Sequence, residues 1–208
     1  MPRATPLPAD ERRAAIVAAT QPLLVRHGRD VSTRQIAEAA GVAEGTIFRV
    51  FETKEALIDA TLDDVFDPTP TCAELRSIDP DLDLEARLTA AVAILQRRLA
   101  TAFGLFHALR LTPRPAPEHI ERQRRDETLI NEAVIAVLAP DADRLGTPLD
   151  HAAQLLRTLT FSVTHPMLSQ LPHDRPDVVV DLLLHGLHYQ PVPDGLSTHR
   201  RIACSSVC

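Results

Sequence analysis

The sequence predicts an all-α protein. Apolar residues recur every three or four positions along most of the 208 residues, and no segment shows the alternation expected of a half-buried strand. The seventeen prolines fall mainly in clusters between these periodic segments, where they can end helices. The chain is therefore expected to consist of long helices separated at definite points.

The composition excludes several other classes of protein. A hydrophobic fraction of 45% and a charged fraction of 24% are typical of a folded globular chain. No apolar run approaches the roughly 18 residues of a membrane helix, and the segment MPRATPLPADERR lacks the apolar stretch of a signal peptide, so we expect a cytoplasmic protein without a membrane partner. Cys72, Cys204 and Cys208 are too few for a disulfide framework or a four-ligand zinc site.

The net charge of −6 argues at first against a nucleic-acid partner, because phosphates repel acidic surfaces. The acidic residues are unevenly distributed, however. Residues 1–55 carry eight basic and seven acidic side chains, whereas residues 56–208 carry fourteen basic and twenty-one acidic ones. The excess acidity therefore lies downstream, and the charge does not exclude nucleic-acid binding by the N-terminal part.

Four helices are expected in the first part of the chain, at residues 10–27, 32–41, 44–51 and 54–66. The first has one apolar stripe, and Gly28 offers a C-cap. The second begins with a capping box, in which Ser32 and Gln35 bond each other's backbone amides, and it ends at Gly41. The fourth begins at Thr53, a favourable N-cap residue.

The segment 67–83 is rich in Asp, Pro and Thr, which predicts a loop and a domain boundary. The helical period resumes at residue 84 and continues to about residue 109, which fits one bent helix or two helices. Three more helices are expected at residues 120–139, 149–170 and 178–189. The chain thus divides into an N-terminal domain of residues 1–66, a helical domain of residues 67–190 and a flexible tail of residues 191–208.

The segment 33–51 has the form of a helix-turn-helix. Two helices that cross near a right angle need a small residue where they touch, a left-handed residue in the turn and a branched apolar residue that holds both. Ala37, Gly41 and Ile47 meet these three needs in this order. Gly41 is the most restrictive of them, because a positive φ penalises any residue with a Cβ atom.

The continuation of this segment resembles the TetR family of transcriptional regulators. Residues 45–51, GTIFRVF, and 53–58, TKEALI, follow the family pattern of Gly, Thr, aliphatic, aromatic, two variable residues and Phe, continued by Lys-Glu and Leu. The similarity covers residues 10–66, and the family's second domain is all helical with a variable sequence. The resemblance implies a homeodomain-like helix-turn-helix head plus a helical-bundle effector and dimerisation domain.

The resemblance also implies a DNA-binding surface that consists of Thr33, Arg34, Glu44, Gly45, Thr46, Phe48, Arg49 and Lys54. Thr33 and Thr46 would bind phosphates, and Arg34 would reach the DNA backbone or a base edge. Lys54 would hold a phosphate at the start of the fourth helix, where free amides and the helix dipole already favour an anion.

The third helix carries the candidates for reading bases. Glu44 can accept a hydrogen bond from a cytosine amino group, and Gly45 lets the backbone come close to DNA. Arg49 is expected to bind a phosphate or a guanine. Many relatives have Tyr at the position of Phe48 and His near Val50, so in this chain Phe48 faces either the core or a thymine methyl group.

A candidate ligand site lies in the helix that follows residue 84. It consists of Phe103, Phe106, His107 and Arg110. An apolar region with a few polar groups is what a small-molecule site requires, but the same residues fit ordinary core packing.

The helix near the C-terminus places Asp181, His185 and His188 on one face, as a metal site would need. No fourth ligand is evident, and histidines near a helix C-terminus also bond free carbonyl groups. We therefore expect no metal site and no other cofactor.

Two apolar helices are expected to form a four-helix interface with the same helices of a second copy. The residues proposed for this homodimer interface are Leu155, Leu156, Leu159, Val163, Val179, Leu182, Leu183 and Leu187. A dimer also suits the DNA site, because two heads related by a two-fold axis bind an inverted repeat and combine their affinities.

These features together predict a sequence-specific DNA-binding transcriptional regulator of TetR type, a repressor that a small ligand releases from its operator. The alternative is a helical enzyme or small-molecule carrier in which the N-terminal unit is only scaffold. No Gly-rich phosphate loop, nucleophile elbow, HExxH helix or CxxC pair occurs in the sequence, which favours a protein that is not an enzyme.

Overall fold

The structure, a computed structural model, describes residues 8–110, 117–169 and 175–186. Within these ranges the chain forms helices and turns and no strand, so the predicted all-α class is confirmed. The helices are α1 (Ala9–His27), η1 (Gly28–Asp30), α2 (Thr33–Ala40), α3 (Glu44–Val50), α4 (Lys54–Phe66), α5 (Thr69–Arg76), α6 (Leu84–Leu109), α7 (Pro117–Leu138), η2 (Ala139–Arg144), α8 (Leu149–Thr164) and α9 (Pro176–His185).

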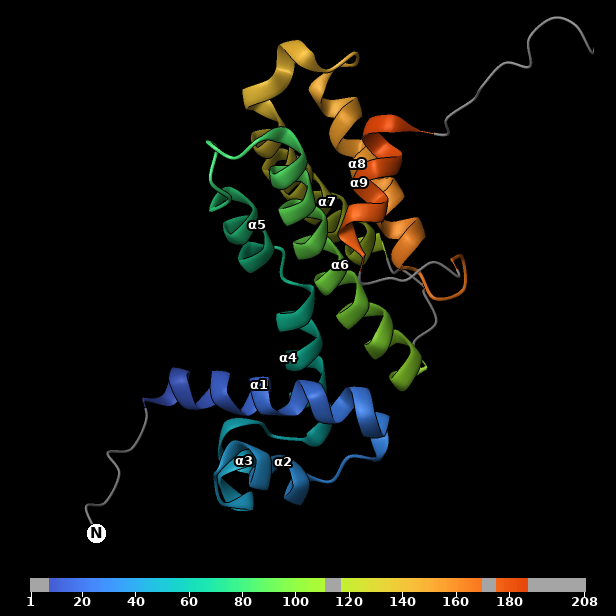
Figure 1. Ribbon diagram of the computed structural model, residues 1–208. Helices are drawn as coiled ribbons and strands as arrows, with labels where there is room; N and C mark the ends of the chain where they lie inside the picture. Colours follow the sequence, from blue (N-terminus) through green and yellow to red (C-terminus); the bar gives the residue numbers. More distant parts are fainter. Residues whose placement is uncertain (1–7, 111–116, 170–174, 187–208) are drawn as a thin grey trace, which may run out of the picture.

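The first four α-helices form a small head, in which α1 lies across α2 and α3, and α4 leads away toward the rest of the molecule (Figure 1). The buried core of the head consists of Ile16, Val17, Leu24, Val31, Ile36, Ala37, Ile47, Phe51, Leu57 and Ile58, together with Leu105 and Leu109. Because Leu105 and Leu109 belong to α6, the last turns of this long helix complete the head's core.

The caps expected in the head are present. The Ser32 hydroxyl accepts from the Gln35 amide at 3.2 Å, while the Ser32 amide donates to Gln35 Oε1 at 2.8 Å. The Thr53 hydroxyl accepts from the Ala56 amide at 3.0 Å. Gly41 has φ of +66°, the left-handed conformation that the turn needs. Local sequence signals therefore set the bounds of these helices.

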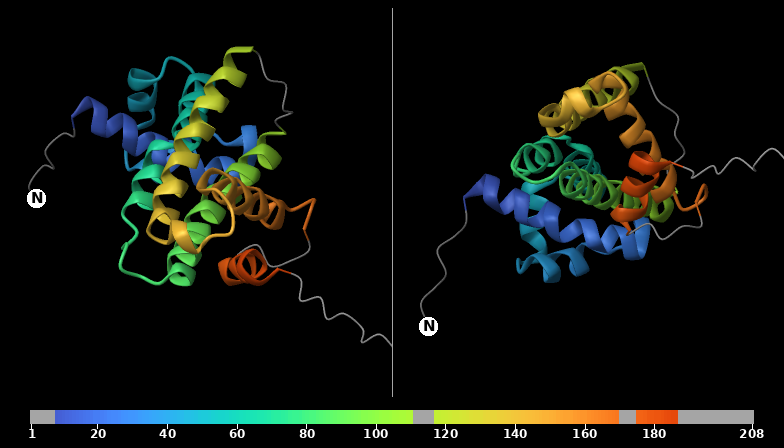
Figure 2. Two further views of the ribbon diagram at one scale, coloured as in Figure 1. Left: turned by 90° about the horizontal axis from the view of Figure 1, so that it is seen from above. Right: turned by 45° about the horizontal axis from the view of Figure 1, so that its top comes forward.

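The remaining helices form a body around α6, which contacts α5, α7, α8 and α9 as well as α1 and α4 of the head (Figure 2). The core of the body is built mainly from aliphatic side chains, among them Leu88, Val92, Leu95, Val134, Leu138, Ala153, Leu156, Val163 and Val179. α6 is a single helix of 26 residues that contributes buried side chains to both cores. Of the two alternatives left open by the sequence, the single helix is therefore the one observed.

The expected loop at residues 67–83 is partly wrong, because Thr69–Arg76 forms α5. Pro68 and Pro70 lie at its first turn, where a missing amide hydrogen costs little because those amides have no partner within the helix. Cys72 and Leu75 of α5 are buried in the body core, and this burial stabilises a helix that a proline-rich sequence seemed to exclude.

The C-terminal half also differs in its bounds. α7 begins at Pro117, three residues before the predicted start, and α8 ends at Thr164 instead of residue 170. His165 precedes Pro166 and is extended, with ψ of 119°, because the proline ring disfavours a helical residue before it. The predicted end of the last helix, Leu187, His188 and the proposed tail lie outside the described residues. Within the described part, no helix has the length and apolar character that a membrane crossing demands.

Candidate nucleic-acid interface

The helix-turn-helix is held from beneath by the head core. Ile36 and Ala37 of α2 and Ile47 of α3 are buried, so each of these helices turns its opposite face to solvent. The turn between them is fixed by two backbone hydrogen bonds, from Gly41 N to Glu38 O at 3.2 Å and from Val42 N to Ala37 O at 2.9 Å. The turn and the core together fix the orientation of α3 relative to α2.

The side chains proposed to bind DNA lie on the solvent side of α2, α3 and the start of α4. Arg34, Glu44, Gly45, Phe48 and Arg49 are exposed, and Thr33, Thr46 and Lys54 are half-buried. Of the two alternatives for Phe48, burial in the core does not occur, because 51% of the residue is accessible.

Thr33 and Glu44 bond to each other across the turn. The Thr33 hydroxyl donates to Glu44 Oε1 at 2.5 Å, which ties the first residue of α2 to the first residue of α3. The Thr33 hydroxyl already uses its only hydrogen in this arrangement. A hydrogen bond from this hydroxyl to a phosphate would therefore require it to release Glu44.

Lys54 holds the head together at its other edge. Its ammonium donates to the carbonyl oxygen of Arg29 at 2.6 Å, which joins the start of α4 to η1. An ammonium group has three donor hydrogens, so this bond leaves hydrogens for an anion. The same side chain can thus position α4 and face a phosphate.

An arginine that the sequence did not single out also lies in the head. Arg13 of α1 is exposed, and its guanidinium carbon lies 4.8 Å from the centre of the Phe51 ring. Stacking of this kind orients the guanidinium plane. The sequence shows two adjacent arginines near the start of α1, but this pattern does not indicate that one of them stacks on Phe51.

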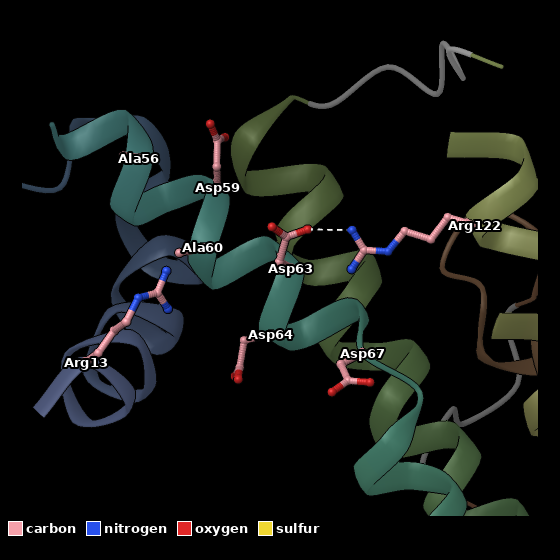
Figure 3. A pocket seen from close by; sticks show the side chains of 8 residues that line it. All are labelled: Arg13, Ala56, Asp59, Ala60, Asp63, Asp64, Asp67 and Arg122. Carbon is pink, nitrogen blue, oxygen red and sulfur yellow. Dashed lines mark hydrogen bonds and ion pairs between the residues drawn. The ribbon is translucent and has the colours of Figure 1, made fainter. Parts of the chain in front are cut away.

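Arg13 lies at one end of an open groove lined by Arg13, Ala56, Asp59, Ala60, Asp63, Asp64, Asp67 and Arg122 (Figure 3). Asp63 points toward Arg122 of α7, and the two side chains form an ion pair of 2.8 Å. Hydrogen bonds from the amide and hydroxyl of Thr69 hold the pKa of Asp67 below its ordinary value of 3.8, so this carboxylate stays charged. The acidic side of α4 would repel phosphates, so it lies outside the candidate interface.

The four residues of the candidate ligand site do not converge. The Phe103 ring lies 4.7 Å from His165 and 5.4 Å from Phe161 of α8, whereas the Phe106 ring packs 5.5 Å from Phe66 of α4. His107 and Arg110 are exposed at the end of α6. Their spacing places the four residues along one side of α6, but Phe103 packs toward α8 and Phe106 toward α4, so their side chains have different partners.

A polar residue that the sequence analysis missed lies in the body core. Gln96 of α6 is 4% exposed, and neither its Nε2 nor its Oε1 has a hydrogen-bond partner. The sequence signal for its burial was its position four residues after Val92, because residues at that spacing share a helix face and Val92 is buried. A buried amide without partners is a polar group that a bound molecule could satisfy.

The residues proposed for a dimer interface divide between the core and the surface. Leu156, Val163 and Val179 are buried within the single chain and pack in the body core, so they are not on the surface. Leu155 is 56% exposed, and Leu159, Leu182 and Leu183 are half-buried. The exposed Phe161, Met167 and Leu168 extend the apolar surface of this region beyond the proposed residues.

The candidate metal residues are only partly described. Asp181 and His185 form a pair with 3.0 Å between Oδ1 and Nδ1, and His188 lies outside the described residues. In the described part of the chain, no three acidic, His or Cys side chains are grouped as a metal would require.

Comparison with known proteins identifies the head. Residues 16–61 match the family model described as "Bacterial regulatory proteins, tetR family". This match spans most of α1, all of α2 and α3, and α4 as far as Thr61. It therefore includes all eight residues proposed to bind DNA.

Solved structures resemble the whole chain in fold. A TetR/AcrR-family transcriptional regulator from Thermobifida fusca YX-ER1 is 19% identical over 86% of this chain and 100% of its own, with a TM-score of 0.60. The TetR transcriptional regulator SCO0520 from Streptomyces coelicolor is 23% identical over 84% and 97%, with a TM-score of 0.57. FadR from Bacillus subtilis, solved with stearoyl-CoA, is 16% identical over 84% and 99%, with a TM-score of 0.52.

At these identities the solved structures show a shared fold, whereas the family model identifies the head by its sequence. Head and body together have the organisation of these regulators, with a helix-turn-helix domain followed by a helical domain. The head therefore matches the tetR family of bacterial regulatory proteins in sequence, and the chain as a whole shares the fold of solved regulators of that family.

Proposed function

We propose that this protein is a repressor that binds an inverted-repeat operator as a homodimer and leaves it when a small ligand binds the body. The observation that best supports DNA recognition is the solvent-facing side of α2 and α3, where Arg34 and Arg49 are exposed on helices fixed by a buried core. Two cationic side chains on a rigid head suit phosphates and base edges. A protein with this function would be located in the bacterial cytoplasm, because the operator DNA is there.

The test is a mobility shift with the DNA upstream of the protein's own gene. Arg34→Ala removes one exposed cation from the interface, so we expect binding to weaken about tenfold and the slope of log affinity against log salt to fall by about one. Arg124→Ala is the matched control, because Arg124 is an exposed arginine of α7 in the body. We expect this control to bind like the wild type.

Lys54→Ala should also weaken binding, but its bond to Arg29 means that the variant's thermal unfolding must be measured alongside. If Arg34→Ala and Lys54→Ala both shift the DNA as strongly as wild type at matched salt, the proposed contacts are wrong. If the wild type binds no DNA, the alternative of a small-molecule carrier gains support.

For ligand release, we propose that the effector enters the body and bonds to Gln96. An amide has both a donor and an acceptor, and the surrounding core is aliphatic, so a mainly apolar molecule with one polar group suits this position. α6 then offers a direct route to the head, because Gln96 and the head residues Leu105 and Leu109 lie on the same helix. A ligand that binds more tightly when α6 adopts another position would shift the protein away from its DNA-binding conformation. The loss of DNA affinity is limited by the ratio of the ligand's affinities for the two conformations.

A thermal-shift panel of fatty acids and acyl-CoAs tests this proposal, chosen because the Bacillus subtilis neighbour was solved with stearoyl-CoA. A ligand that bonds to Gln96 should raise the melting temperature of the wild type more than that of Gln96→Leu. Equal shifts for both proteins would place the ligand elsewhere.

A further inference from the structure

Phe48 lies in an unusual environment for a phenylalanine. It belongs to α3 and is 51% exposed, although the adjacent Ile47 is completely buried. In the described part of the chain, no aromatic ring and no arginine is stacked on the Phe48 ring. About half of this residue's surface is therefore accessible, and this apolar surface remains available for a partner.

The residues around Phe48 indicate what kind of partner fits. Glu44 is one helical turn earlier on the same face, Arg49 is adjacent, and Gly45 has open space where a Cβ atom would be. A single ring surrounded by charged groups differs from the contiguous apolar patch that another protein would cover. A cationic side chain, a carboxylate that can accept from a base amino group and one apolar contact together suit the major groove of DNA.

The chemistry of the ring limits what it can read. A phenyl group has no hydrogen-bonding atom, so it distinguishes bases only by an apolar contact. In the major groove the C5-methyl group of thymine is the apolar feature among the four common bases, and 5-methylcytosine carries the same group. For the same reason Phe48 cannot bond to a phosphate.

We propose that Phe48 reads a pyrimidine C5-methyl group, that of one thymine in each half-site. This inference rests on the proposed DNA binding and adds the base feature that α3 recognises. Binding covers the exposed ring and the methyl group together, which removes apolar surface of both from water.

The test begins with selection of a binding sequence from random duplexes by the full-length wild-type protein. Each thymine of the selected half-site is then replaced in turn by uracil, which removes only the methyl group. We expect one replacement in each half-site to weaken binding about fourfold, the effect of one buried methyl group. Replacing that thymine by cytosine or by 5-methylcytosine distinguishes the two bases that carry a C5-methyl group. We expect the 5-methylcytosine duplex to bind better than the cytosine duplex, and the thymine duplex to bind best.

Variants of Phe48 test whether its phenyl ring causes the preference for thymine over uracil. Phe48→Ala should bind the thymine and uracil duplexes equally, whereas Phe48→Leu, which keeps an apolar side chain, should still prefer thymine. Because Phe48 is exposed, both variants should melt close to the wild-type temperature.

Two results would overturn the inference: a wild-type protein that binds the thymine and uracil duplexes equally, or a Phe48→Ala variant that keeps the wild-type preference. Preference for 5-methylcytosine over thymine would also overturn the assignment to thymine. Selection of no sequence at all by the wild type is a different outcome, which would overturn the proposed function itself.

Discussion

Neighbouring residues of α3 have different roles, because some pack in the head core and others face solvent. Ile47 is completely buried beneath α1, whereas Phe48 and Arg49 face solvent. Substitution of Ile47 would leave a cavity in the head core, so a loss of DNA binding would not identify a DNA contact. Substitutions at the exposed positions test the proposed interface without opening a cavity in the core.

Gly45 offers a prediction in which stability and binding change in opposite directions. It lies in the first turn of α3, and an added Cβ atom would meet nothing within 4 Å. Gly45→Ala should stabilise the helix by about 0.5 to 1 kcal/mol, yet weaken DNA binding severalfold if the backbone approaches DNA there. Thermal melting and a mobility shift measure the two effects.

Gly146→Ala is the control for Gly45→Ala, because Gly146 also has open space at its Cβ position but lies in the body. We expect it to leave DNA binding unchanged. Wild-type DNA affinity in Gly45→Ala would show that the α3 backbone does not come close to DNA.

Asp141 of η2 is a buried carboxylate that bonds to Arg87 near the start of α6. Burial raises its pKa, but hydrogen bonds from Arg144 and Arg87 outweigh this effect and leave the pKa below the ordinary 3.8. Arg87 is itself buried and also donates to the carbonyl oxygens of Pro80, at 3.0 Å, and Val137, at 3.2 Å. Removing the carboxylate would therefore leave a buried guanidinium without its charged partner.

Because the pKa of Asp141 is lower in the folded than in the unfolded protein, its contribution to stability is complete above about pH 4. It is lost as the pH falls through the folded-state pKa. We expect Asp141→Asn to melt at a lower temperature than the wild type at pH 7, and the difference to shrink below pH 4.

Asp177→Asn is the control, because the exposed Asp177 is paired with Arg175 at the surface. Its effect at pH 7 should be small. A constant difference between wild type and Asp141→Asn from pH 7 to pH 3 would contradict the role of the ionised carboxylate.

At the scale of the elements, α6 joins the body to the head. Its buried residues Val92 and Leu95 lie in the body core, while Leu105 and Leu109 lie in the head core. The contact with η1 is especially close, because a Cβ atom at Gly28 would lie 2.5 Å from the carbonyl oxygen of Ala108. The end of α6 and the end of α1 therefore touch through backbone atoms.

This close approach predicts different effects for two glycines with positive φ. Gly41→Ala adds left-handed strain in open space and should cost about 1 kcal/mol of the free energy of unfolding. Gly28→Ala should cost about 1 to 3 kcal/mol more, because its methyl group collides with the Ala108 carbonyl and its ψ of −141° suits only glycine.

Urea unfolding of both variants measures this difference. Equal losses of stability would mean that α6 moves away from η1 without cost. A larger loss in Gly28→Ala would support tight packing between the body and the head.

At the scale of the whole molecule, exposed apolar residues offer a surface for the proposed homodimer. Leu155 projects from α8 with 56% of its surface accessible, and Leu156 beside it is buried. Leu155→Glu should convert a dimer to a monomer in sedimentation velocity, because a carboxylate would be buried at the interface. DNA affinity should fall as well, since a monomer has one head.

Leu82→Glu is the control for Leu155→Glu. Leu82 is 40% exposed in the turn before α6 and is not part of α8. It should sediment like the wild type. A Leu155→Glu variant that stays dimeric would place the interface on another surface.

The sequence predicted the local structure of the head well. Ser32, Gln35, Gly41 and Thr53 act through hydrogen bonds or backbone angles within a few residues, and the observed caps follow these signals. The helical class and the family resemblance also depend on local spacing, which needs no knowledge of distant contacts.

Other features depended on contacts between distant parts of the chain. α5 forms in a proline-rich segment because Cys72 and Leu75 become buried, and Phe103 meets Phe161 only because α6 packs on α8. Hydrophobic periodicity shows that a residue such as Leu156 is apolar, but it cannot tell a core within one chain from an interface between two.

The sequence by itself determined the helical class, the helix-turn-helix and its family, because spacing, caps and the glycine turn act over short distances. Only the tertiary structure decided that Phe48 faces solvent, that Gln96 is buried without a partner and that α6 completes the head core. The physical reason is that burial depends on which distant helix covers a side chain, and the order of residues along one helix does not specify that partner.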